Sequence, residues 1–330
     1  MDAKLLSDAV SPLLEWYRIY KRDLPWRHGR TPYTALVAEL MLQQTRVEAV
    51  KERYVRFLAS FPTPEALAAA SEEEVLKAWE GLGYYSRARH LHAAAKVIAE
   101  QGFPTTFEGV RALPGVGDYT AGAVCSIALG LPAPAVDGNV LRVLTRLYAD
   151  PSNIDDGATK AKFAALLKAV YPPETADFCE ALMELGAIVC VPNGAPACGG
   201  CPWQKVCRAH LAGREEHFPV RSEKRARKVV NATVCVLRCG AKYALEKRPA
   251  KGLLAGLWQF PFFEGGTPAL GKVLAEKHAK HIFTHVEWRM TGRLVEAESE
   301  LAPYTWVTAR ELRETYALPS AFRAFTEWVR

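Results

Sequence analysis

The sequence predicts a multidomain protein in which an all-α domain precedes a smaller α+β domain. Apolar residues recur at helical spacing from residue 5 to residue 187. The next segment, residues 208–230, holds seven basic and three acidic residues and Pro219, and the pattern beyond it alternates as in strands. A chain of 330 residues is long enough for two cores. We place the domains at residues 1–213 and 231–330, with a basic linker at 214–230.

Charge and hydropathy restrict the class of protein. The formal net charge of +6 permits binding to nucleic acid without requiring it. No apolar run has the length of a membrane span, and the N-terminus lacks the apolar region of a signal peptide. Asp2, Asp8 and Glu15 argue against a transit peptide. We expect a protein of the cell interior with no membrane partner.

The first two elements are a helix and a proline-broken loop. Residues 5–22 have an amphipathic pattern, and the apolar stripe comprises Leu5, Leu13, Leu14, Trp16, Tyr17 and Tyr20. The loop at 22–33 carries three arginines and Trp26. Arginine beside an exposed aromatic ring suits phosphate contact and base stacking. If Trp26 instead packs into the core, the segment is an ordinary surface loop.

A strongly apolar helix is predicted at residues 34–47, with Glu39 in its middle. Glu39 is the only acid between Leu24 and Val47. Burial would raise the pKa of this carboxyl and make it a proton donor near neutral pH. The alternative is that Glu39 faces water or pairs with an arginine. The polar residues that follow, Gln43-Gln44-Thr45, suit insertion into a base stack.

Two glycine-containing segments come next. Residues 62–100 predict two helices separated by GLGYYSRARHL, where Gly81 and Gly83 mark a bend. The tyrosines after this bend suit DNA contact, or they are core residues. At 113–117 (LPGVG), Gly115 and Gly117 let backbone N–H groups approach a ligand, and a helix that begins after them favours a phosphate.

Asp137 is the only acid between Tyr119 and Ala149. It lies in apolar surroundings, directly before a helical pattern. Such a residue is either a helix N-cap or a carboxylate kept for chemistry, and the pattern leaves both open.

The order of the motifs PWR, ELMLQQT, GLGYYSRA, LPGVG and VDGN resembles that of the helix-hairpin-helix DNA glycosylases, and among them the MutY-type adenine glycosylases. The resemblance implies that Glu39 protonates the adenine and that ionised Asp137 stabilises, or transiently bonds to, the anomeric carbon. It also implies that Tyr119 and Asn139 form hydrogen bonds around Asp137 and the attacking water. Gln44 and Tyr84 match residues that wedge into the duplex. The further DNA contacts implied are Trp26, Arg27, Thr45, Leu82, Gly115 and Gly117.

Four cysteines within 18 residues form a candidate metal site: Cys190, Cys198, Cys201 and Cys207. Without a secretory signal, metal binding is favoured over disulfides. Four thiolates suit zinc or an iron–sulfur cluster, and spacing separates the two poorly. The resemblance implies a 4Fe–4S cluster, with C-x6-C-x2-C-x5-C spacing. Here the first gap has seven residues, in a Pro/Gly-rich loop that could absorb the insertion.

The C-terminal domain is similar to a Nudix domain. The acid-rich metal-binding helix of Nudix hydrolases is missing, because GTPALGKVLAEKHAK has a single acid, Glu276. The domain therefore resembles the part of the adenine glycosylases that checks the opposite base for 8-oxoguanine. Phe283, Thr284 and His285 occupy the position of the family's Phe-Ser-His loop.

The sequence thus predicts a monofunctional glycosylase that removes adenine opposite 8-oxoguanine or guanine in double-stranded DNA. We expect a monomer in the cytoplasm, associated with the nucleoid if the source is bacterial. Two other classes of protein predict different residues. An endonuclease III-like lyase would carry lysine at position 119, and a non-enzymatic iron–sulfur DNA-binding protein would have no reason to keep Glu39, Tyr119 and Asp137. The C-terminal domain lacks the metal-binding acids that nucleotide hydrolysis requires, which argues against that activity.

Overall fold

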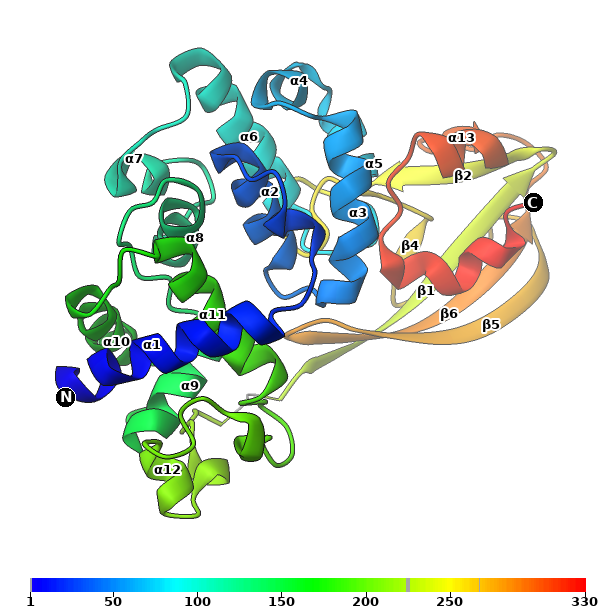
Figure 1. Cartoon of the computed structure of the whole chain (residues 1–330). Helices are drawn as coiled ribbons and strands as arrows, with labels where there is room; N and C mark the ends of the chain where they lie inside the picture. The colour runs from blue at the N-terminus through cyan, green and yellow to red at the C-terminus, as the bar shows by residue number, and fades with distance from the viewer. Residues whose placement is uncertain (1, 224–225, 267) are drawn as a thin grey trace. The chain divides into compact units, whose positions relative to one another are not determined.

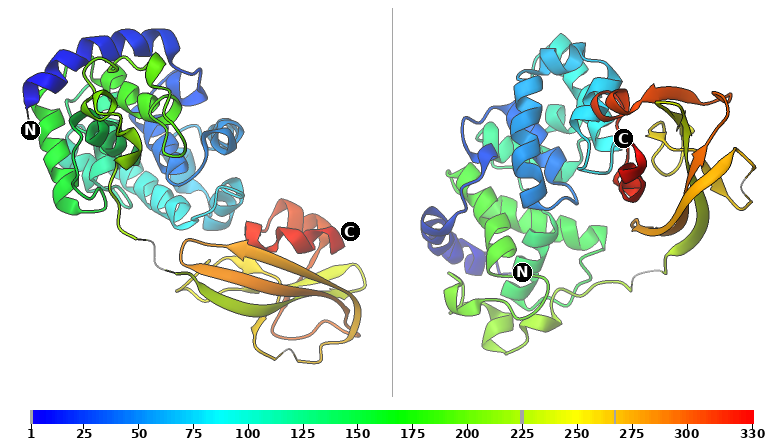
Figure 2. Two further views of the ribbon diagram at one scale, coloured as in Figure 1. Left: turned by 90° about the horizontal axis from the view of Figure 1, so that it is seen from below. Right: turned by 90° about the vertical axis from the view of Figure 1, so that its right-hand side faces the viewer.

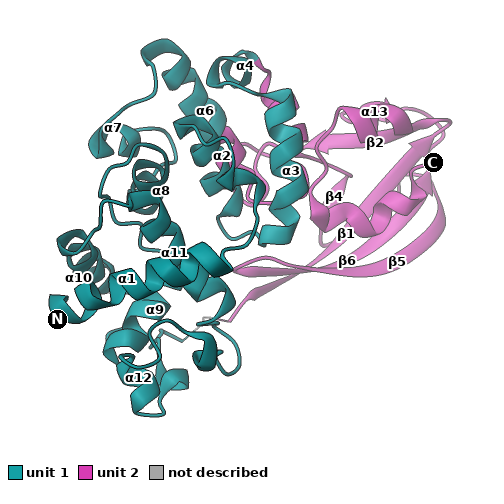
Figure 3. Cartoon of the chain, in the orientation of Figure 1, with its two compact units in different colours: residues 1–69, 90–223 teal, residues 70–89, 224–330 magenta. Residues whose placement is uncertain are grey.

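The computed structural model describes residues 2–223, 226–266 and 268–330, which divide into two compact units (Figure 3). Unit 1 comprises residues 1–69 and 90–223, and unit 2 comprises residues 70–89 and 224–330. The division after residue 223 falls inside the predicted linker, of which Lys224 and Arg225 lie outside the described residues. Residues 70–89 were assigned from the sequence to the first domain, but their contacts place them in unit 2.

Unit 1 is helical (Figure 1). Its elements are α1 (Ala3–Tyr20), η1 (Pro25–Arg27), α2 (Pro32–Leu42), α3 (Val47–Ser60), α4 (Pro64–Ala69), α6 (Ser86–Gln101, whose first residues belong to unit 2), α7 (Phe107–Arg111), α8 (Asp118–Ala128), α9 (Gly138–Tyr148), α10 (Gly157–Ala169), α11 (Thr175–Ile188), η2 (Cys198–Gly200), α12 (Arg208–Leu211) and η3 (Glu215–His217). No helix among the described residues has the length and apolar character needed to cross a bilayer.

Helix α1 begins where the Asp2 side chain accepts a hydrogen bond from the Lys4 amide (2.9 Å), an N-cap that satisfies one otherwise unpaired donor. Its predicted apolar stripe is largely buried, and Leu13 and Tyr17 are fully so. Tyr20 differs from the prediction: it is 59% exposed and stacks only on the ring of Trp16.

Helix α2 is buried on almost every side rather than on one stripe. Thr31 and Thr34 form a capping box at its start, which fixes the first turn. The helix packs against α8 and ends at Leu42, earlier than the sequence predicted. The helix ends there because Gln43 has a non-helical ψ of 114°, and Gln44 then adopts a left-handed φ of 55°.

The main core of unit 1 is formed by α1, α9, α10 and α11, together with Trp203. Helix α11 also lies against α8, so it connects the core with the region of α2 (Figure 1). It passes α9 closely at Gly186, where an added Cβ would come within 2.6 Å of the Asn139 Cβ. Only glycine permits this approach without displacing Asn139.

Helices α7 and α8 form the predicted hairpin. Thr106 caps α7, and the chain then makes a turn closed by the bond from Val116 N to Leu113 O (3.1 Å). Gly115 has a φ of 75°, and a Cβ there would collide with His90. Position 115 therefore requires glycine both for its backbone conformation and for the space beside His90. Gly117 is the N-cap residue of α8.

Unit 2 contains a seven-stranded mixed sheet of order β3-β2-β1-β6-β5, with β4 paired to β1 and β7 to β2. The strands are β1 (Lys228–Cys239), β2 (Lys242–Lys247), β3 (Trp258–Gln259), β4 (Phe262–Glu264), β5 (Lys272–Ile282), β6 (Val286–Glu296) and β7 (Thr305–Thr308). The pair β1 and β6 is parallel, and the other pairs are antiparallel.

Two helical segments, α13 (Ala309–Glu314) and η4 (Ser320–Trp328), cover one face of this sheet (Figure 2). They bury Leu312, Phe322 and Phe325 against β1, β2 and β6. The segment after β4, where a Nudix hydrolase would have its acidic helix, enters strand β5 instead. The aromatic loop expected from the sequence contains the short strands β3 and β4.

Residues 70–89 join unit 2 through hydrogen bonds. The segment contains α5 (Glu72–Ala78), and behind it Glu80 Oε1 accepts a bond from Leu318 N (2.9 Å). Arg89 Nη1 donates to Ala255 O (2.9 Å), and Tyr84 OH shares a 2.7 Å bond with Thr284 Oγ1. These bonds join segments that are far apart in sequence, so no local sequence pattern predicts them.

We predict that Gly292→Ala destabilises unit 2. A Cβ at Gly292 would lie 2.2 Å from Cε1 of the fully buried Phe325. Overpacking of this kind costs about 1–3 kcal/mol. Urea unfolding, followed by hydrogen exchange in β1 and β6, should show the loss. Gly266→Ala is the matched control, because nothing lies within 4 Å of that position. Equal effects of the two substitutions would contradict the packing argument.

Candidate active site

A pocket of about 570 Å³ in unit 1 contains most of the residues predicted to act on a substrate. Helices α2, α8, α9 and α11 and the loop around η1 form its walls. Predicted residues that line it are Trp26, Arg27, Glu39, Gln44, Thr45, Tyr119, Asp137 and Asn139. The four predicted catalytic residues therefore share one cavity.

Glu39 lies on α2 and is 6% exposed. Its Oε2 accepts a hydrogen bond from Tyr119 OH (2.7 Å). Burial raises the pKa of Glu39 to about 7, with the nearby charge of Asp137 acting in the same direction and the Tyr119 bond opposing both. Of the two interpretations that the sequence left open, the buried one is correct, and this carboxyl can hold a proton near neutral pH.

Asp137 is the N-cap of α9, and it also faces the pocket. Its Oδ1 accepts from Val140 N (2.7 Å) and its Oδ2 from Asn139 Nδ2 (2.7 Å). Burial raises the pKa of Asp137 above its usual value, although these bonds and the positive charge of Arg142 oppose the rise because they favour the carboxylate. The two roles considered from the sequence, cap and functional carboxylate, are thus compatible in one residue.

Tyr119 differs from the sequence expectation in its partner. We expected its hydroxyl to bond to Asp137, but the hydroxyl donates to Glu39, and Asn139 takes the place beside Asp137. A hydroxyl has one proton to donate, so the bond to Glu39 uses it. Burial, followed by the charge of Glu39, raises the pKa of Tyr119 well above its usual value, which keeps the phenol neutral.

A buried arginine connects Asp137 with the cysteine segment. Arg142 is 5% exposed, and its Nη2 donates to Asn139 Oδ1 (2.8 Å) and to Gly186 O (2.7 Å). Its Nε donates to Cys190 O (2.7 Å). One guanidinium thereby holds Asn139, α11 and the start of the cysteine segment in register.

A second buried charge cluster forms another part of the pocket wall. Glu184 receives bidentate bonds from Arg22 (2.8 and 2.7 Å) and a further bond from Arg27 (3.0 Å). Glu180 accepts from Tyr17 OH (2.8 Å) and from Arg30 (2.6 Å). Burial alone would raise the pKa of Glu184, but the two arginines outweigh it and hold that pKa at about 2. Arg27 is therefore engaged with protein carboxylates.

Gln44 and Tyr84, the two predicted wedges, share an unusual backbone. Their φ angles are 55° and 45°, in the left-handed region that bulky residues seldom adopt. Tyr84 is 46% exposed and Gln44 is also exposed. Such strain is often found at functional positions, because the surrounding fold must maintain it. Gln44 belongs to unit 1 and Tyr84 to unit 2.

The remaining predicted contacts are distributed over both units. Trp26 packs edge-on against Tyr54 and is 8% exposed, so it is a core residue that also lines the pocket. Leu82 is buried in unit 2. Gly115 and Gly117 lie in the α7–α8 turn and do not line the pocket.

The loop between β5 and β6 holds the last three predicted contacts. Phe283 is half-buried and packs against Trp288 at 4.9 Å between ring centroids. Thr284 and His285 are exposed. The bond from Phe283 N to Val286 O (2.8 Å) closes the turn, so Phe283 anchors a tip whose other two side chains face outward.

The four cysteines predicted to hold a metal line one small cavity of about 20 Å³ in unit 1. The longer first gap does not remove Cys190 from it, because a bond from Ala197 N to Val189 O (3.0 Å) closes the extra loop. Sulfur atoms around a single zinc ion lie about 3.8 Å apart, given Zn–S bonds of about 2.3 Å. Among the described residues, no three of these four thiols come within 4.8 Å of one another. The thiols are therefore spaced more widely than a single zinc ion requires.

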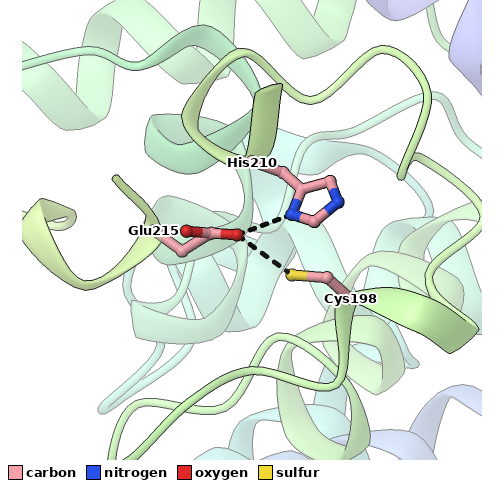
Figure 4. Close-up of side chains that lie close together, drawn as sticks. All are labelled: Cys198, His210 and Glu215. Atoms are coloured by element: carbon pink, nitrogen blue, oxygen red, sulfur yellow. Dashed lines mark hydrogen bonds and ion pairs between the residues drawn. The ribbon is translucent and has the colours of Figure 1, made fainter. Parts of the chain in front are cut away.

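A mixed group surrounds one of these thiols (Figure 4). Glu215 Oε1 lies 2.6 Å from His210 Nδ1 and accepts a weak bond from Cys198 Sγ (3.8 Å). Arg146 Nη1 donates to Cys190 Sγ (3.3 Å). Burial, and then the charge of Glu215, raises the pKa of Cys198 to about 11. Of the other four cysteines, Cys239 is half-buried and the rest are core residues.

Sequence reasoning did not find several of these residues: Arg22, Arg142, Glu180, Glu184 and Gly186. Glu180 and Glu184 could have been found, since each is an acid in an apolar helix, the signal that identified Glu39. They lie one turn apart on α11 and therefore on the same face. Arg142 carries no such signal, because an arginine in an amphipathic helix is usually solvated.

Comparison with known proteins agrees with this architecture. Residues 37–169 match the model of the HhH-GPD superfamily of base excision DNA repair proteins, and residues 233–328 match that of the NUDIX domain. A solved thermostable thymine-DNA glycosylase is 30% identical, with a TM-score of 0.58, and the match covers 63% of the chain and 98% of that protein. A trapped endonuclease III–DNA complex, at 24% identity and a TM-score of 0.55, has the same fold over 64% of the chain and 99% of its own. Unit 1 thus has the fold of the HhH-GPD repair proteins.

Relatives that match both units define the family. The adenine DNA glycosylase of Schizosaccharomyces pombe is 34% identical, and the match covers 82% of the chain and 72% of the relative. The adenine DNA glycosylase of Buchnera aphidicola from Acyrthosiphon pisum is 31% identical, and the match covers 78% of the chain and 75% of the relative. The chain belongs to the adenine DNA glycosylase family. It spans little more than half the length of the Arabidopsis thaliana relative, to which it is 36% identical over 92% of the chain and 55% of the relative.

We predict that Glu39→Gln stabilises the fold increasingly as the pH rises from 4.5 to 7. The folded-state pKa of Glu39, about 7, exceeds the ordinary value of 4.5, so the folded protein binds this proton more tightly than the unfolded chain. Stability is therefore lost across that window as pH increases, to a total of about 3 kcal/mol. Glutamine removes the loss. Urea unfolding at a series of pH values measures the difference between variant and wild type. A difference independent of pH would contradict the burial argument.

Proposed function

We propose that the protein is a monofunctional glycosylase that releases adenine opposite 8-oxoguanine or guanine from double-stranded DNA. The observation that carries the proposal is the pair Glu39 and Asp137, two carboxyls in one pocket with contrasting surroundings. Glu39 accepts one hydrogen bond and is otherwise desolvated. Asp137 accepts two bonds that favour its ionised form. Hydrolysis of an N-glycosidic bond needs both a proton donor and an anion.

Glu39 is the proton donor in this mechanism. Adenine leaves readily only if a ring nitrogen is protonated as the bond to the sugar breaks. With a pKa of about 7, Glu39 holds a proton at neutral pH and gives it up to a base that needs it. Tyr119 OH bonds to the same carboxyl and orients it, so that the proton points into the pocket.

Asp137 stabilises the positive charge that develops on the sugar. The N-cap bond from Val140 N fixes one carboxylate oxygen, and Asn139 fixes the other. A carboxylate held in this way need not reorganise when charge develops beside it, which is the main advantage of a preorganised site. The adenine must leave the base stack to reach the pocket, and exposed Gln44 with its strained backbone supports a role as a wedge.

Tyr119 supports hydrolysis over lyase chemistry. A lyase needs an amine beside the anomeric carbon to form a Schiff base. The residue opposite Glu39 is a phenol whose pKa is raised well above its usual value, so it remains neutral and has no route to a Schiff base. The second candidate class, an endonuclease III-like lyase, has no residue in this position to perform its chemistry.

Unit 2 would read the base opposite the adenine. Exposed Thr284 and His285 form the tip of the β5–β6 loop, and Tyr84, a predicted wedge, bonds to Thr284. Threonine keeps the hydroxyl of the family's serine, which supports a hydrogen bond to the opposite base. The same unit has no acidic helix between β4 and β5 among its described residues, which argues against nucleotide hydrolysis.

We also propose a 4Fe–4S cluster held by Cys190, Cys198, Cys201 and Cys207. The donor set is four thiols on one cavity, and their separation exceeds what one zinc ion requires. Such a cluster would tie the 190–207 segment together. We expect the protein to act as a monomer and to be located with its DNA substrate, in the cytoplasm or nucleoid.

We predict that Glu39→Gln and Asp137→Asn each abolish adenine release while DNA binding survives. A positioned acid or base contributes about 10²–10⁴-fold to rate. Single-turnover assays should use duplexes with adenine opposite 8-oxoguanine, guanine, cytosine or thymine. We expect wild-type release to be fastest opposite 8-oxoguanine and then guanine. Near wild-type rates in either variant, or no preference among the four duplexes, would refute the proposal.

We predict that Tyr119→Lys gains borohydride-trappable complexes and strand nicking, with slower adenine release because the bond to Glu39 is lost. The wild type should leave intact abasic sites that break only on later heating with alkali. Tyr119→Phe is the control: it also loses the bond to Glu39 but cannot trap DNA. Efficient trapping by the wild type would favour the lyase class instead.

We predict that the purified protein is brown, with broad visible absorbance and about four irons per chain. Elemental analysis and the visible spectrum test this directly. A colourless protein with stoichiometric zinc would mean that the longer first gap has changed the metal, and that the group formed by Cys198, His210 and Glu215 takes part in binding it.

A further inference from the structure

The start of the basic linker returns to the catalytic pocket. Within unit 1, Val220 O accepts a hydrogen bond from Ile154 N (3.0 Å), and the Val220 backbone pairs with Asn153 as an isolated parallel bridge. Ser222 N donates to Asp155 Oδ2 (3.0 Å), and Ser222 Oγ accepts from Asn153 Nδ2 (2.7 Å). The residues on both sides of Arg221 are therefore fixed to one short segment before α10.

This anchoring carries the Arg221 side chain to the rim of the pocket. Arg221 lines the same cavity as Glu39 and Asp137. A Cβ placed on Gly138, the residue after Asp137, would lie 3.8 Å from Arg221 Nη2. The guanidinium thus lies beside the residue that follows Asp137, although 84 residues separate Asp137 and Arg221 in sequence (221 − 137).

Arg221 is the pocket arginine that the protein leaves available. Arg22 and Arg27 are bonded to Glu184, but for Arg221 the described part of the chain supplies no side-chain hydrogen bond and no ion pair. It is also exposed. Asp155, an acid that also lines the pocket, already accepts the Ser222 amide.

Like charges gather at this rim. Lys160 on α10 also lines the pocket, and it too is exposed. Two exposed cations, Arg221 and Lys160, thus line one cavity, and a second positive charge beside the guanidinium favours a bound anion.

We propose that Arg221 binds a backbone phosphate flanking the nucleotide whose base enters the pocket. This inference rests on the proposed function. When adenine occupies the pocket, its sugar faces Asp137, and the two phosphates of that nucleotide must lie at the rim where Gly138 is exposed. A guanidinium presents paired donors that match phosphate oxygens, and contacts of this kind fix the register of the protein on the duplex.

The anchored backbone makes such a contact effective. Ordering a free linker on binding would cost conformational entropy, whereas the hydrogen bonds of Val220 and Ser222 order it beforehand. Arg221 would therefore bind substrate without taking part in the proton transfer by Glu39 or the charge stabilisation by Asp137.

The test pairs Arg221→Ala with neutral methylphosphonates placed one at a time at each phosphate within two nucleotides of the target adenosine. Affinity is measured with a 2′-fluoroadenosine duplex opposite 8-oxoguanine, which resists cleavage, and excision is measured with the normal adenosine. Arg221→Lys tests rescue by charge. Arg227→Ala, an exposed arginine of the same basic segment that does not line the pocket, is the matched control.

We expect Arg221→Ala to weaken binding by about tenfold and to reduce the salt slope of log K by about 0.9, the value for one lost phosphate contact. At one flanking phosphate, the methylphosphonate should cause the same loss in wild type and no further loss in Arg221→Ala. Arg227→Ala should be additive with every methylphosphonate, and Arg221→Lys should restore most of the affinity.

Additive behaviour of Arg221→Ala at all flanking phosphates, or wild-type affinity of that variant, would overturn the inference. Failure of the proposed function gives a different result, since the wild type would then release adenine from none of the duplexes. Because the substituted side chain is exposed, we expect Arg221→Ala to fold normally. A circular dichroism spectrum equal to that of the wild type verifies this.

Discussion

The site in unit 1 depends on the burial of one carboxyl, that of Glu39, which raises its pKa to about 7. The carboxyl is buried because α2 is covered on nearly every side and α8 packs along it. A single hydroxyl, that of Tyr119, meets the carboxyl. A cation in the same position would favour the carboxylate, as Arg22 and Arg27 do for Glu184 in the same pocket. The pocket therefore places two glutamates in opposite states by giving one a phenol and the other two guanidinium groups.

Buried arginines hold the rest of the site together. Arg142 joins Asn139, Gly186 and Cys190, so the cap of α9, the middle of α11 and the cysteine segment cannot move independently. Leaving such a charge without its acceptors would cost several kcal/mol, which makes the group a strong constraint on geometry. The cysteine segment, remote in sequence from the pocket, thus takes part in orienting Asp137 through two hydrogen-bonded residues.

Much of this could be predicted from sequence, for identifiable reasons. The helical unit and the strand pattern after the linker follow from local periodicity, whereas the convergence of Glu39, Tyr119 and Asp137 is implied by the family resemblance that the motif order carries. The partner of Tyr119 could not be predicted, because the choice between Glu39 and Asp137 is made by the packing of α8 against α2. The membership of residues 70–89 in unit 2 rests on long-range bonds such as that between Tyr84 and Thr284. Arg221 was visible only as one of seven basic residues in a linker.

The helix cap formed by Asp137 has a consequence for heat tolerance. The bond from Val140 N that orients the carboxylate is also the bond that closes the first turn of α9. The first turn of α9 resists fraying, because its residues Val140 and Leu141 are buried in the main core of unit 1. Asp137 therefore keeps its orientation as long as that core is intact. On warming, the carboxylate would lose its orientation only together with the core, so the geometry of the site and the global fold would share one thermal limit.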